Sequence, residues 1–154
     1  MNVLLLGATG SIGRSVLSVI DQNNSELSLF GISLNKNTSE ADNIIKKFSP
    51  SYVYIDDKNI FGFQKATNKT QYLNGDSSLK DLINHKDVDV IICAVSGFAG
   101  LKATYIAAST GKKILLANKE SIVAGGDLIL PLAKENDSEI IPIDSEHNAI
   151  FQCL

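Results

Sequence analysis

Two carboxylates lie two residues apart in the segment Ile143-Asp144-Ser145-Glu146-His147. The apolar residues before them predict a strand, and in an extended backbone the side chains of residues i and i+2 point to the same side. Two converging carboxylates suit a hard cation such as Mg²⁺ or Mn²⁺, and they could also form a general acid/base pair if their surroundings separate their pKa values. A helix N-terminus remains an open alternative, with Asp144 or Ser145 as the cap and Glu146 favoured by the helix dipole.

A second polar cluster, Asn118-Lys119-Glu120-Ser121, directly follows the apolar run Lys113–Ala117. A lysine at the end of a strand can polarise a carbonyl group or hold an anionic substrate. The alternative is an exposed loop in which Glu120 occupies the first turn of a helix. The segment Val95–Gly100 also joins a strand to a helix, and its small residues suit the approach of a ligand. Neither histidine has a Cys or His partner at metal-ligand spacing, so we do not expect zinc.

Glycines recur every third residue in Gly7-Ala8-Thr9-Gly10-Ser11-Ile12-Gly13, between the apolar run Val3–Leu6 and an amphipathic helical pattern. A G-x-x-G-x-x-G turn in this context is typical of dinucleotide binding. Glycine allows the sharp turn, the approach of a pyrophosphate to the backbone and the close packing of helix on sheet, and the helix N-terminus supplies N–H groups. A glycine-rich turn without a ligand is the alternative interpretation.

The end of the second predicted strand indicates which dinucleotide binds. Sites for NAD usually have Asp or Glu about 20 residues after the glycine turn, where it binds the ribose 2′-hydroxyl. Here the segment Ser33–Thr38 contains no acid, and Lys36 offers a positive charge where a 2′-phosphate would lie. The sequence therefore predicts NADPH in preference to NADH. A polar loop before the next helix is the alternative.

The elements that must position these clusters alternate along the chain. Short apolar runs predict strands at Val3–Leu6, Leu27–Leu34, Tyr52–Ile55, Val88–Ala94, Lys113–Ala117 and Glu139–Ile143. Helical spacing separates several of them, most clearly over Ala41–Phe48. Continuous apolar runs are typical of strands buried on both faces, so we predict an α/β fold: a doubly wound (Rossmann-like) parallel sheet with helices on both faces.

Two parts of this pattern are less regular. The segment Asn59–Asn84 is interpreted as a short helix, a possible strand near Gln71–Leu73 and a helix over Ser77–Asn84. Pro142 lies inside the last apolar run, and a proline in a strand belongs on an edge or near a strand end.

Composition excludes several classes of protein. The 154 residues carry 14 basic and 17 acidic side chains, a net charge of −3 that argues against nucleic-acid binding and against a basic membrane-surface protein. Two cysteines are too few for a disulfide framework and fit a reducing compartment. No apolar run could span a membrane and no leader is visible, so we expect a cytoplasmic protein. Arg14 is the only arginine, so phosphate recognition is expected to use lysine, hydroxyls and backbone N–H groups.

Three segments together resemble the 1-deoxy-D-xylulose 5-phosphate reductoisomerase family: GATGSIG at Gly7–Gly13, LLANKES at Leu115–Ser121 and PIDSEHNAIFQCL at Pro142–Leu154. The resemblance extends over the whole chain. It implies an NADP-dependent oxidoreductase/isomerase of non-mevalonate isoprenoid biosynthesis. Such an enzyme uses a divalent metal (Mn²⁺ or Mg²⁺) to rearrange the phosphosugar 1-deoxy-D-xylulose 5-phosphate and NADPH to reduce the product to 2-C-methyl-D-erythritol 4-phosphate.

The resemblance also implies roles for individual residues. Those implied to bind NADPH are Thr9, Gly10, Ser11 and Ile12 at the pyrophosphate, Asn35, Lys36 and Asn37 at the 2′-phosphate, and Asn118 and Glu120 along the cofactor. Those implied to act at the reaction centre are Asp144 and Glu146 as metal ligands, Lys119, Ser145 and Glu146 as substrate contacts, and Lys119 and Glu146 as catalytic groups. Asn35, Ser96 and Phe98 depart from residues that are usual in the family.

Family members are several hundred residues long, so we expect this chain to be an N-terminal portion of one. We predict an NADPH-binding domain over residues 1–141 and the beginning of the metal-binding region over residues 142–154. The third metal ligand, the lid and the phosphate-binding residues are expected downstream, and the full-length protein is expected to form a homodimer. The chain alone is therefore expected to bind NADPH weakly and to leave substrate unconverted.

Two other functions remain open. A different NADP-dependent dehydrogenase, such as aspartate-semialdehyde dehydrogenase, needs a catalytic cysteine in a loop, whereas Cys93 is predicted inside a buried strand. A nucleotide-binding redox sensor would use the glycine turn but would have no need of Lys119, Asp144 and Glu146.

Overall fold

A parallel sheet forms the centre of the molecule, which is a computed structural model that describes residues 1–35, 38–55 and 69–153. The strands are β1 (Asn2–Leu6), β2 (Ser28–Leu34), β3 (Tyr52–Ile55), β4 (Gln71–Leu73), β5 (Val90–Cys93), β6 (Lys113–Leu116) and β7 (Glu139–Pro142). They form a seven-stranded sheet in the order β4-β3-β2-β1-β5-β6-β7. Every neighbouring pair is parallel, as the sequence predicted.

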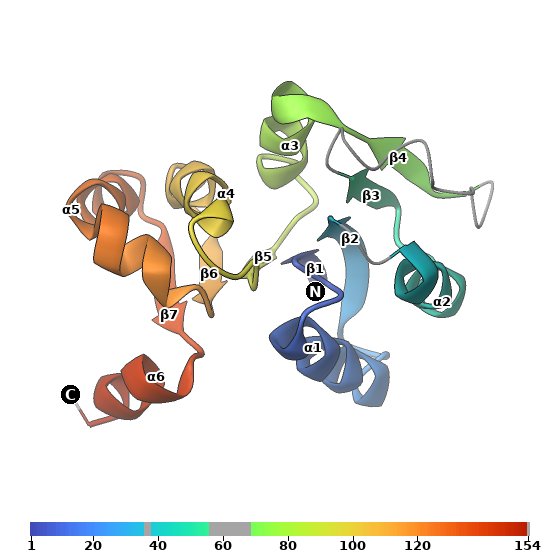
Figure 1. The fold of residues 1–154 in the computed structure, drawn as a ribbon, viewed down its shortest axis with the longest axis horizontal. Helices are drawn as coiled ribbons and strands as arrows, with labels where there is room; N and C mark the ends of the chain where they lie inside the picture. Colours follow the sequence, from blue (N-terminus) through green and yellow to red (C-terminus); the bar gives the residue numbers. More distant parts are fainter. Residues whose placement is uncertain (36–37, 56–68, 154) are drawn as a thin grey trace.

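Helices cover both faces of this sheet (Figure 1). They are α1 (Ser11–Gln22), α2 (Thr38–Phe48), α3 (Gly75–Ile83), α4 (Ala99–Ala108), α5 (Lys119–Glu135) and α6 (Ser145–Phe151). The view along the sheet in Figure 1 shows α1, α2 and α6 on one face and α3, α4 and α5 on the other. The predicted doubly wound architecture is therefore confirmed.

Alternate residues of β1 enter two different cores, because successive side chains of a strand point to opposite faces. Val3 and Leu5 pack in the core that α1 and α2 cover, and Leu4 and Leu6 pack in the core that α3 and α4 cover. All four side chains are at most 3% exposed. This two-sided burial explains why the central strands are continuously apolar in the sequence.

The less regular segments agree with the sequence where the structure describes them. The possible strand near Gln71–Leu73 is β4, and the helix expected over Ser77–Asn84 is α3. Pro142 is the last residue of β7, which is an edge strand, so its missing N–H interrupts no ladder. The short helix expected before β4 lies outside the described residues.

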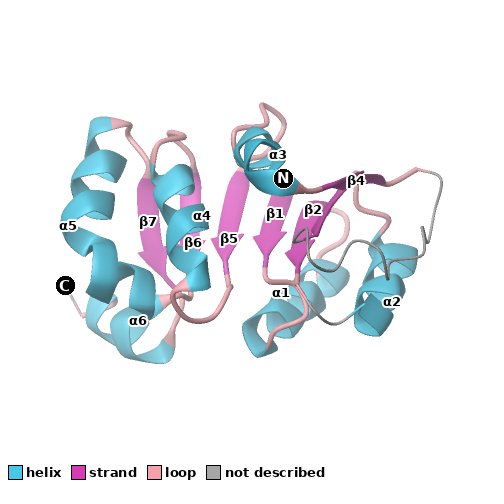
Figure 2. Ribbon diagram, turned by 45° about the horizontal axis from the view of Figure 1, so that its top comes forward, coloured by secondary structure: helices cyan, strands magenta, loops and turns pink. Residues whose placement is uncertain are grey.

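The order of the strands creates a switch point between β1 and β5. The chain proceeds from β1 outward through β2, β3 and β4, and then crosses to β5, β6 and β7 on the other side. The carboxyl ends of the strands share one edge of the sheet (Figure 2). In open α/β sheets, ligands bind outside this edge at the switch point. Within the described ranges, no helix is long and apolar enough to cross a membrane.

Candidate functional site

Two glycines of the turn after β1 are required by the fold itself. Gly7 has a φ of +92°, and a Cβ on it would lie 2.6 Å from the carbonyl oxygen of Ala94. A Cβ on Gly13 would lie 2.4 Å from the carbonyl oxygen of Gly7. The backbone N–H of Gly7 donates to both the hydroxyl and the carbonyl oxygen of Ser33, which joins the turn to the end of β2. These glycines bring β1, β2, β5 and α1 into close contact.

Gly10 differs, because nothing in the packing requires it to be glycine. Its φ is −77°, and a Cβ built on it would have its nearest contacts at 3.5 and 3.8 Å, which is ordinary van der Waals distance. Gly10 is the N-cap of α1, it provides no side-chain capping hydrogen bond, and no acidic residue lies in the first turn. The missing side chain leaves the positive end of the helix open to an anionic group.

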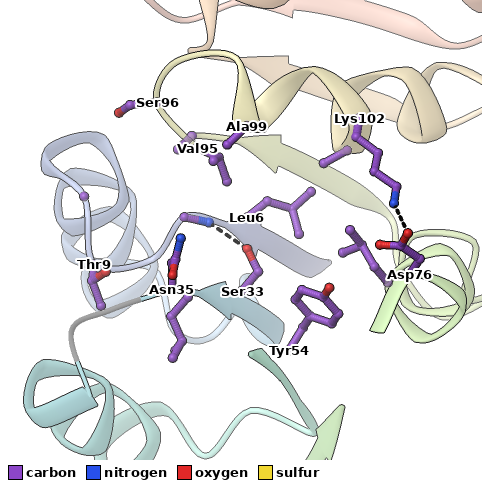
Figure 3. Close-up of a pocket in the computed structure, with 16 residues that line it drawn as sticks. Leu6, Thr9, Ser33, Asn35, Tyr54, Asp76, Val95, Ser96, Ala99 and Lys102 are labelled. Atoms are coloured by element: carbon purple, nitrogen blue, oxygen red, sulfur yellow. Dashed lines mark hydrogen bonds and ion pairs between the residues drawn. The ribbon is translucent and has the colours of Figure 1, made fainter. Parts of the chain in front are cut away.

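A cavity of about 330 Å³ lies beside this turn, at the switch point of the sheet. Its lining residues come from the ends of β1, β2, β3 and β5 and from α3 and α4 (Figure 3): Leu6, Gly7, Thr9, Gly10, Ser33, Leu34, Asn35, Tyr54, Asp76, Leu79, Ala94, Val95, Ser96, Ala99, Lys102 and Ala103. The predicted residues Thr9, Gly10 and Asn35 are therefore brought together. Ser11 and Ile12 follow them in the first turn of α1.

Several lining residues were not anticipated from the sequence. Lys102 of α4 and Asp76 of α3 form an ion pair that closes one side of the cavity (Figure 3). Tyr54, at the end of β3, lines the same side. The only available signal was that Tyr54 lies near the carboxyl end of a predicted strand, because the other two residues approach each other only through the packing of α3 on α4.

The predicted 2′-phosphate residues are only partly described. Asn35 lines the cavity, whereas Lys36 and Asn37 lie outside the described residues. Arg14 lies beside the glycine turn: its Nη1 donates to the carbonyl oxygen of Thr9 at 2.8 Å and lies 3.3 Å from Oε1 of Glu40 on α2. The sequence indicated only that Arg14 is the one arginine in the chain, although its position directly after Gly13 places it in the first turns of α1.

The second candidate site lies where β7 meets α6, and its geometry corrects one inference from the sequence. Asp144 and Glu146 do not project from one extended strand, since β7 ends at Pro142 and α6 begins at Ser145. Asp144 is instead the N-cap of α6, and its Oδ1 accepts a hydrogen bond from the backbone N–H of His147 at 3.0 Å. The alternative interpretation, a capped helix N-terminus with Glu146 in the first turn, is the observed one.

Both carboxylates are held by neighbouring donors. Oδ2 of Asp144 lies 2.9 Å from Nδ1 of His147. Glu146 Oε1 lies 3.2 Å from Nζ of Lys119, and its Oε2 accepts from the hydroxyl of Ser145 at 3.1 Å. The Lys119 contact joins the polar cluster after β6 to the one after β7. The side chains of Lys119 and Glu146 are 49% and 63% exposed, so this ion pair adds little to stability.

The pKa values at this site follow from these contacts. Burial raises the pKa of Asp144, but hydrogen bonds from the backbone and ring of His147 lower it more, so it lies below its ordinary value. A hydrogen bond from its own backbone N–H, and others from Lys119 and Ser145, lower the pKa of Glu146. The pKa of Lys119 is raised, mainly by its hydrogen bond to Glu146. Both carboxylates are therefore ionised at neutral pH, the state that a hard cation requires.

The donor set fits a hard divalent cation incompletely. Carboxylate oxygens are the ligands that Mg²⁺ and Mn²⁺ prefer. Among the described residues, however, no group of three or more His, Cys, Asp or Glu side chains is arranged to hold a metal ion. The site thus provides two carboxylates and an adjacent ammonium group.

The remaining predicted residues lie at the start of α5. Lys119 and Glu120 are exposed in its first turn, whereas Asn118 is the N-cap and is 2% exposed.

Cys93 lies inside β5, as predicted. Burial raises the pKa of its thiol, and a hydrogen bond with Thr104 opposes this only in part, so the pKa is about 12. A buried neutral thiol is inert as a nucleophile, so Cys93 does not provide the loop cysteine of a semialdehyde dehydrogenase.

Comparison with known proteins agrees with this geometry. A sequence model of the family "1-deoxy-D-xylulose 5-phosphate reductoisomerase" matches residues 3–126. Relatives with that name are 41% identical in Vesicomyosocius okutanii and 39% identical in Acinetobacter baumannii (strain ACICU), in both cases over 99% of this chain. The chain spans about 40% of the length of these relatives.

Solved structures give the same result. The structure of DOX-P reductoisomerase with NADPH, fosmidomycin and magnesium is 37% identical, with a TM-score of 0.90 over 100% of this chain and 39% of that one. The Zymomonas mobilis reductoisomerase in complex with NADPH is 34% identical, with a TM-score of 0.91 over 99% of this chain and 41% of its own. A homoserine dehydrogenase from Thiobacillus denitrificans, at 17% identity and a TM-score of 0.61, shares the fold alone.

Proposed function

The chain belongs to the 1-deoxy-D-xylulose 5-phosphate reductoisomerase family, and we propose that it supplies the NADPH-binding domain and part of the metal site of such an enzyme. The whole protein would then rearrange 1-deoxy-D-xylulose 5-phosphate and reduce the product with NADPH to 2-C-methyl-D-erythritol 4-phosphate. Residues 1–141 form the cofactor domain in this proposal, and residues 142–154 begin the metal-binding region. The solved relative that holds NADPH, fosmidomycin and magnesium together supports this assignment.

The single observation that carries the cofactor proposal is the open N-terminus of α1 at Gly10. Packing leaves room for a side chain there, and the chain has none. The pyrophosphate of NADPH is proposed to bind the backbone at Thr9, Gly10, Ser11 and Ile12, where N–H groups and the helix dipole favour an anion. The neighbouring cavity at the switch point takes the nucleotide. Asn35, Lys36 and Asn37 are proposed to hold the 2′-phosphate, with Lys36 giving the preference for NADPH.

The reaction centre is proposed to lie between the start of α5 and the start of α6. Asp144 and Glu146 would hold Mg²⁺ or Mn²⁺, which when bound polarises oxygens of the substrate. Lys119 lies 3.2 Å from Glu146, so its ammonium group is placed to hold an anionic substrate oxygen next to the metal ligands. The hydroxyl of Ser145, which donates to Glu146, is proposed to contact the substrate. Glu120, exposed in the first turn of α5, is proposed to contact the cofactor.

Replacement of Gly10 tests the cofactor proposal. Gly10→Ala places a methyl group in the open cradle without a clash in the protein, so the chain should keep its thermal midpoint and bind NADPH at least about tenfold more weakly. Fluorescence titration of the 154-residue chain with NADPH and with NADH measures both affinities, and wild type should prefer NADPH. Unchanged NADPH affinity in Gly10→Ala, or equal wild-type affinities for the two cofactors, would contradict the proposal.

A matched control distinguishes ligand binding from folding. Gly13→Ala forces its Cβ to within 2.4 Å of the carbonyl oxygen of Gly7, so this variant should lose stability as well as affinity. The two substitutions add the same methyl group three residues apart. Only the Gly10 variant should separate loss of binding from loss of stability.

A further inference from the structure

A buried cluster of polar side chains lies between the cavity and the start of α5. Its members are Asn118 at 2% exposure and Thr104 and Ser121 at 0%, from the β6–α5 junction, α4 and α5 respectively. Buried polar groups are costly unless they are hydrogen-bonded, so each needs a reason to be there. Nothing in the proposed chemistry uses Thr104 or Ser121.

The side chain of Asn118 uses all its hydrogen-bonding capacity within the protein. Its Nδ2 donates to the carbonyl oxygen of Val95 and, at 2.7 Å, to that of Gly97. Its Oδ1 accepts from the backbone N–H of Ser121 at 2.7 Å and from the Ser121 hydroxyl at 2.5 Å. An amide has two donors and about two acceptor positions. The Asn118 side chain therefore has no hydrogen bond left to offer a ligand.

The same cluster encloses the amide from the side of α4. A Cβ on Gly100 would lie 2.5 Å from Nδ2 of Asn118, so only glycine admits the amide there. The hydroxyl of Thr104 donates to the carbonyl oxygen of Gly100 at 3.0 Å. The Ser121 hydroxyl lies 3.3 Å from that of Thr104. Asn118 thus holds the carbonyl oxygens of Val95 and Gly97 directly, whereas Thr104 acts from within α4 through its contact with Ser121.

The tip of the loop so held is open to solvent. Gly97 has a φ of +69°, and a Cβ on it would meet no atom within 4 Å. Phe98 is 73% exposed. Yet Val95, Ser96 and Ala99 of this segment line the cavity (Figure 3). The loop borders the carboxyl end of β5 at the switch point, so its conformation determines the shape of that wall of the site.

We propose that Thr104, Ser121 and Asn118 form a buried clamp, and that this clamp positions the loop 95–100 against the first turn of α5 for the nicotinamide half of the cofactor. Asn118 is then a positioning residue, whose side chain acts through the loop rather than on the cofactor. The inference rests on the proposed function for the identity of the ligand. The geometry of the clamp is independent of it.

Two ligands distinguish positioning from general stability. NADPH spans the whole site, whereas 2′-phospho-ADP-ribose lacks only the nicotinamide. Thr104→Val keeps the shape of the side chain and removes the hydroxyl, and Ser121→Ala removes one donor to Asn118. Each variant should weaken NADPH binding about tenfold, because the loop that faces the nicotinamide loses part of its hydrogen-bonded support, and change 2′-phospho-ADP-ribose binding less than about twofold. Thr104→Ser, which retains the hydroxyl, should bind NADPH within about twofold of wild type.

The remaining outcomes of the binding experiment would each contradict either the clamp or the proposed function. Equal weakening for both ligands, or no weakening for either, overturns the clamp as a positioning device. If wild type binds neither ligand, the proposed function fails instead. Hydrogen exchange then still decides the inference: amides of residues 95–100 should exchange faster in Thr104→Val than in Thr104→Ser, and equal exchange rates would overturn it.

Discussion

Gly7, Gly10 and Gly13 share a spacing motif but serve different physical needs. Gly7 and Gly13 are fixed by contacts below 3 Å to the protein's own backbone, and Gly7 also by its positive φ. Neither close contacts nor a positive φ requires glycine at position 10. We propose that its lack of a side chain admits a group that approaches from outside, and this one residue therefore carries the cofactor proposal.

The two cysteines are predicted to differ in their reactivity toward thiol reagents. Burial raises the pKa of its thiol to about 12, whereas Cys153 is exposed. The Cys93 thiol is therefore neutral and shielded from solvent at pH 8, so a thiol reagent should modify Cys153 alone in the native chain. Ellman's reagent should titrate one thiol per native chain and two after denaturation.

The variant Cys153→Ser serves as the control for this titration. It should show no fast-reacting thiol until the chain is unfolded. Rapid modification of Cys93 in the folded protein would mean that β5 opens readily, and it would reopen the possibility of thiol chemistry.

Helix α6 shows how one side chain serves an element as well as a site. Asp144 caps this helix through Oδ1, and the helix has no buried residues among those described. An N-cap contributes about 1 kcal/mol to such a helix. The first turn of α6, which carries Ser145 and Glu146, therefore depends on Asp144 for its order.

Substitution of Asp144 separates capping from charge. Asp144→Ala should lower the opening free energy of α6 by about 1 kcal/mol, whereas Asp144→Asn keeps a capping oxygen and should lower it by less than half as much. Native-state hydrogen exchange of the α6 amides measures this. Equal protection in wild type and Asp144→Ala would show that the cap is dispensable, and equal loss in both variants would show that the charge matters more than the cap.

At the scale of the whole molecule, the sheet was the most predictable feature. Every apolar run that the sequence marked as a strand became one, because burial on both faces leaves continuous Val, Ile and Leu that no other element explains as well. The glycine turn was also predictable, since its conformation depends on local backbone geometry. For Asp144 and Glu146 the sequence left two geometries open, an extended strand and a capped helix N-terminus, since it does not show that β7 ends at Pro142 and not after it.

Other parts of the site depend on contacts between distant elements. Asp76 and Lys102 meet only when α3 packs beside α4, and the Thr104–Ser121 contact only when α4 packs beside α5. No local pattern around these residues distinguishes them from ordinary helix positions. Arg14 is similar, because its contact with Glu40 requires α1 and α2 to lie on the same face of the sheet.

NADPH is proposed to bind where β1, β2 and β5 end. Backbone NMR of the isotope-labelled chain, titrated with NADPH, tests this binding site most directly. Amide shifts should change at residues 9–12, at 33–35 and at 94–100, while the amides of β4 and of the α5 carboxyl end remain unchanged. Saturable changes confined to other parts of the chain, or no saturable change at the glycine turn, would contradict the account.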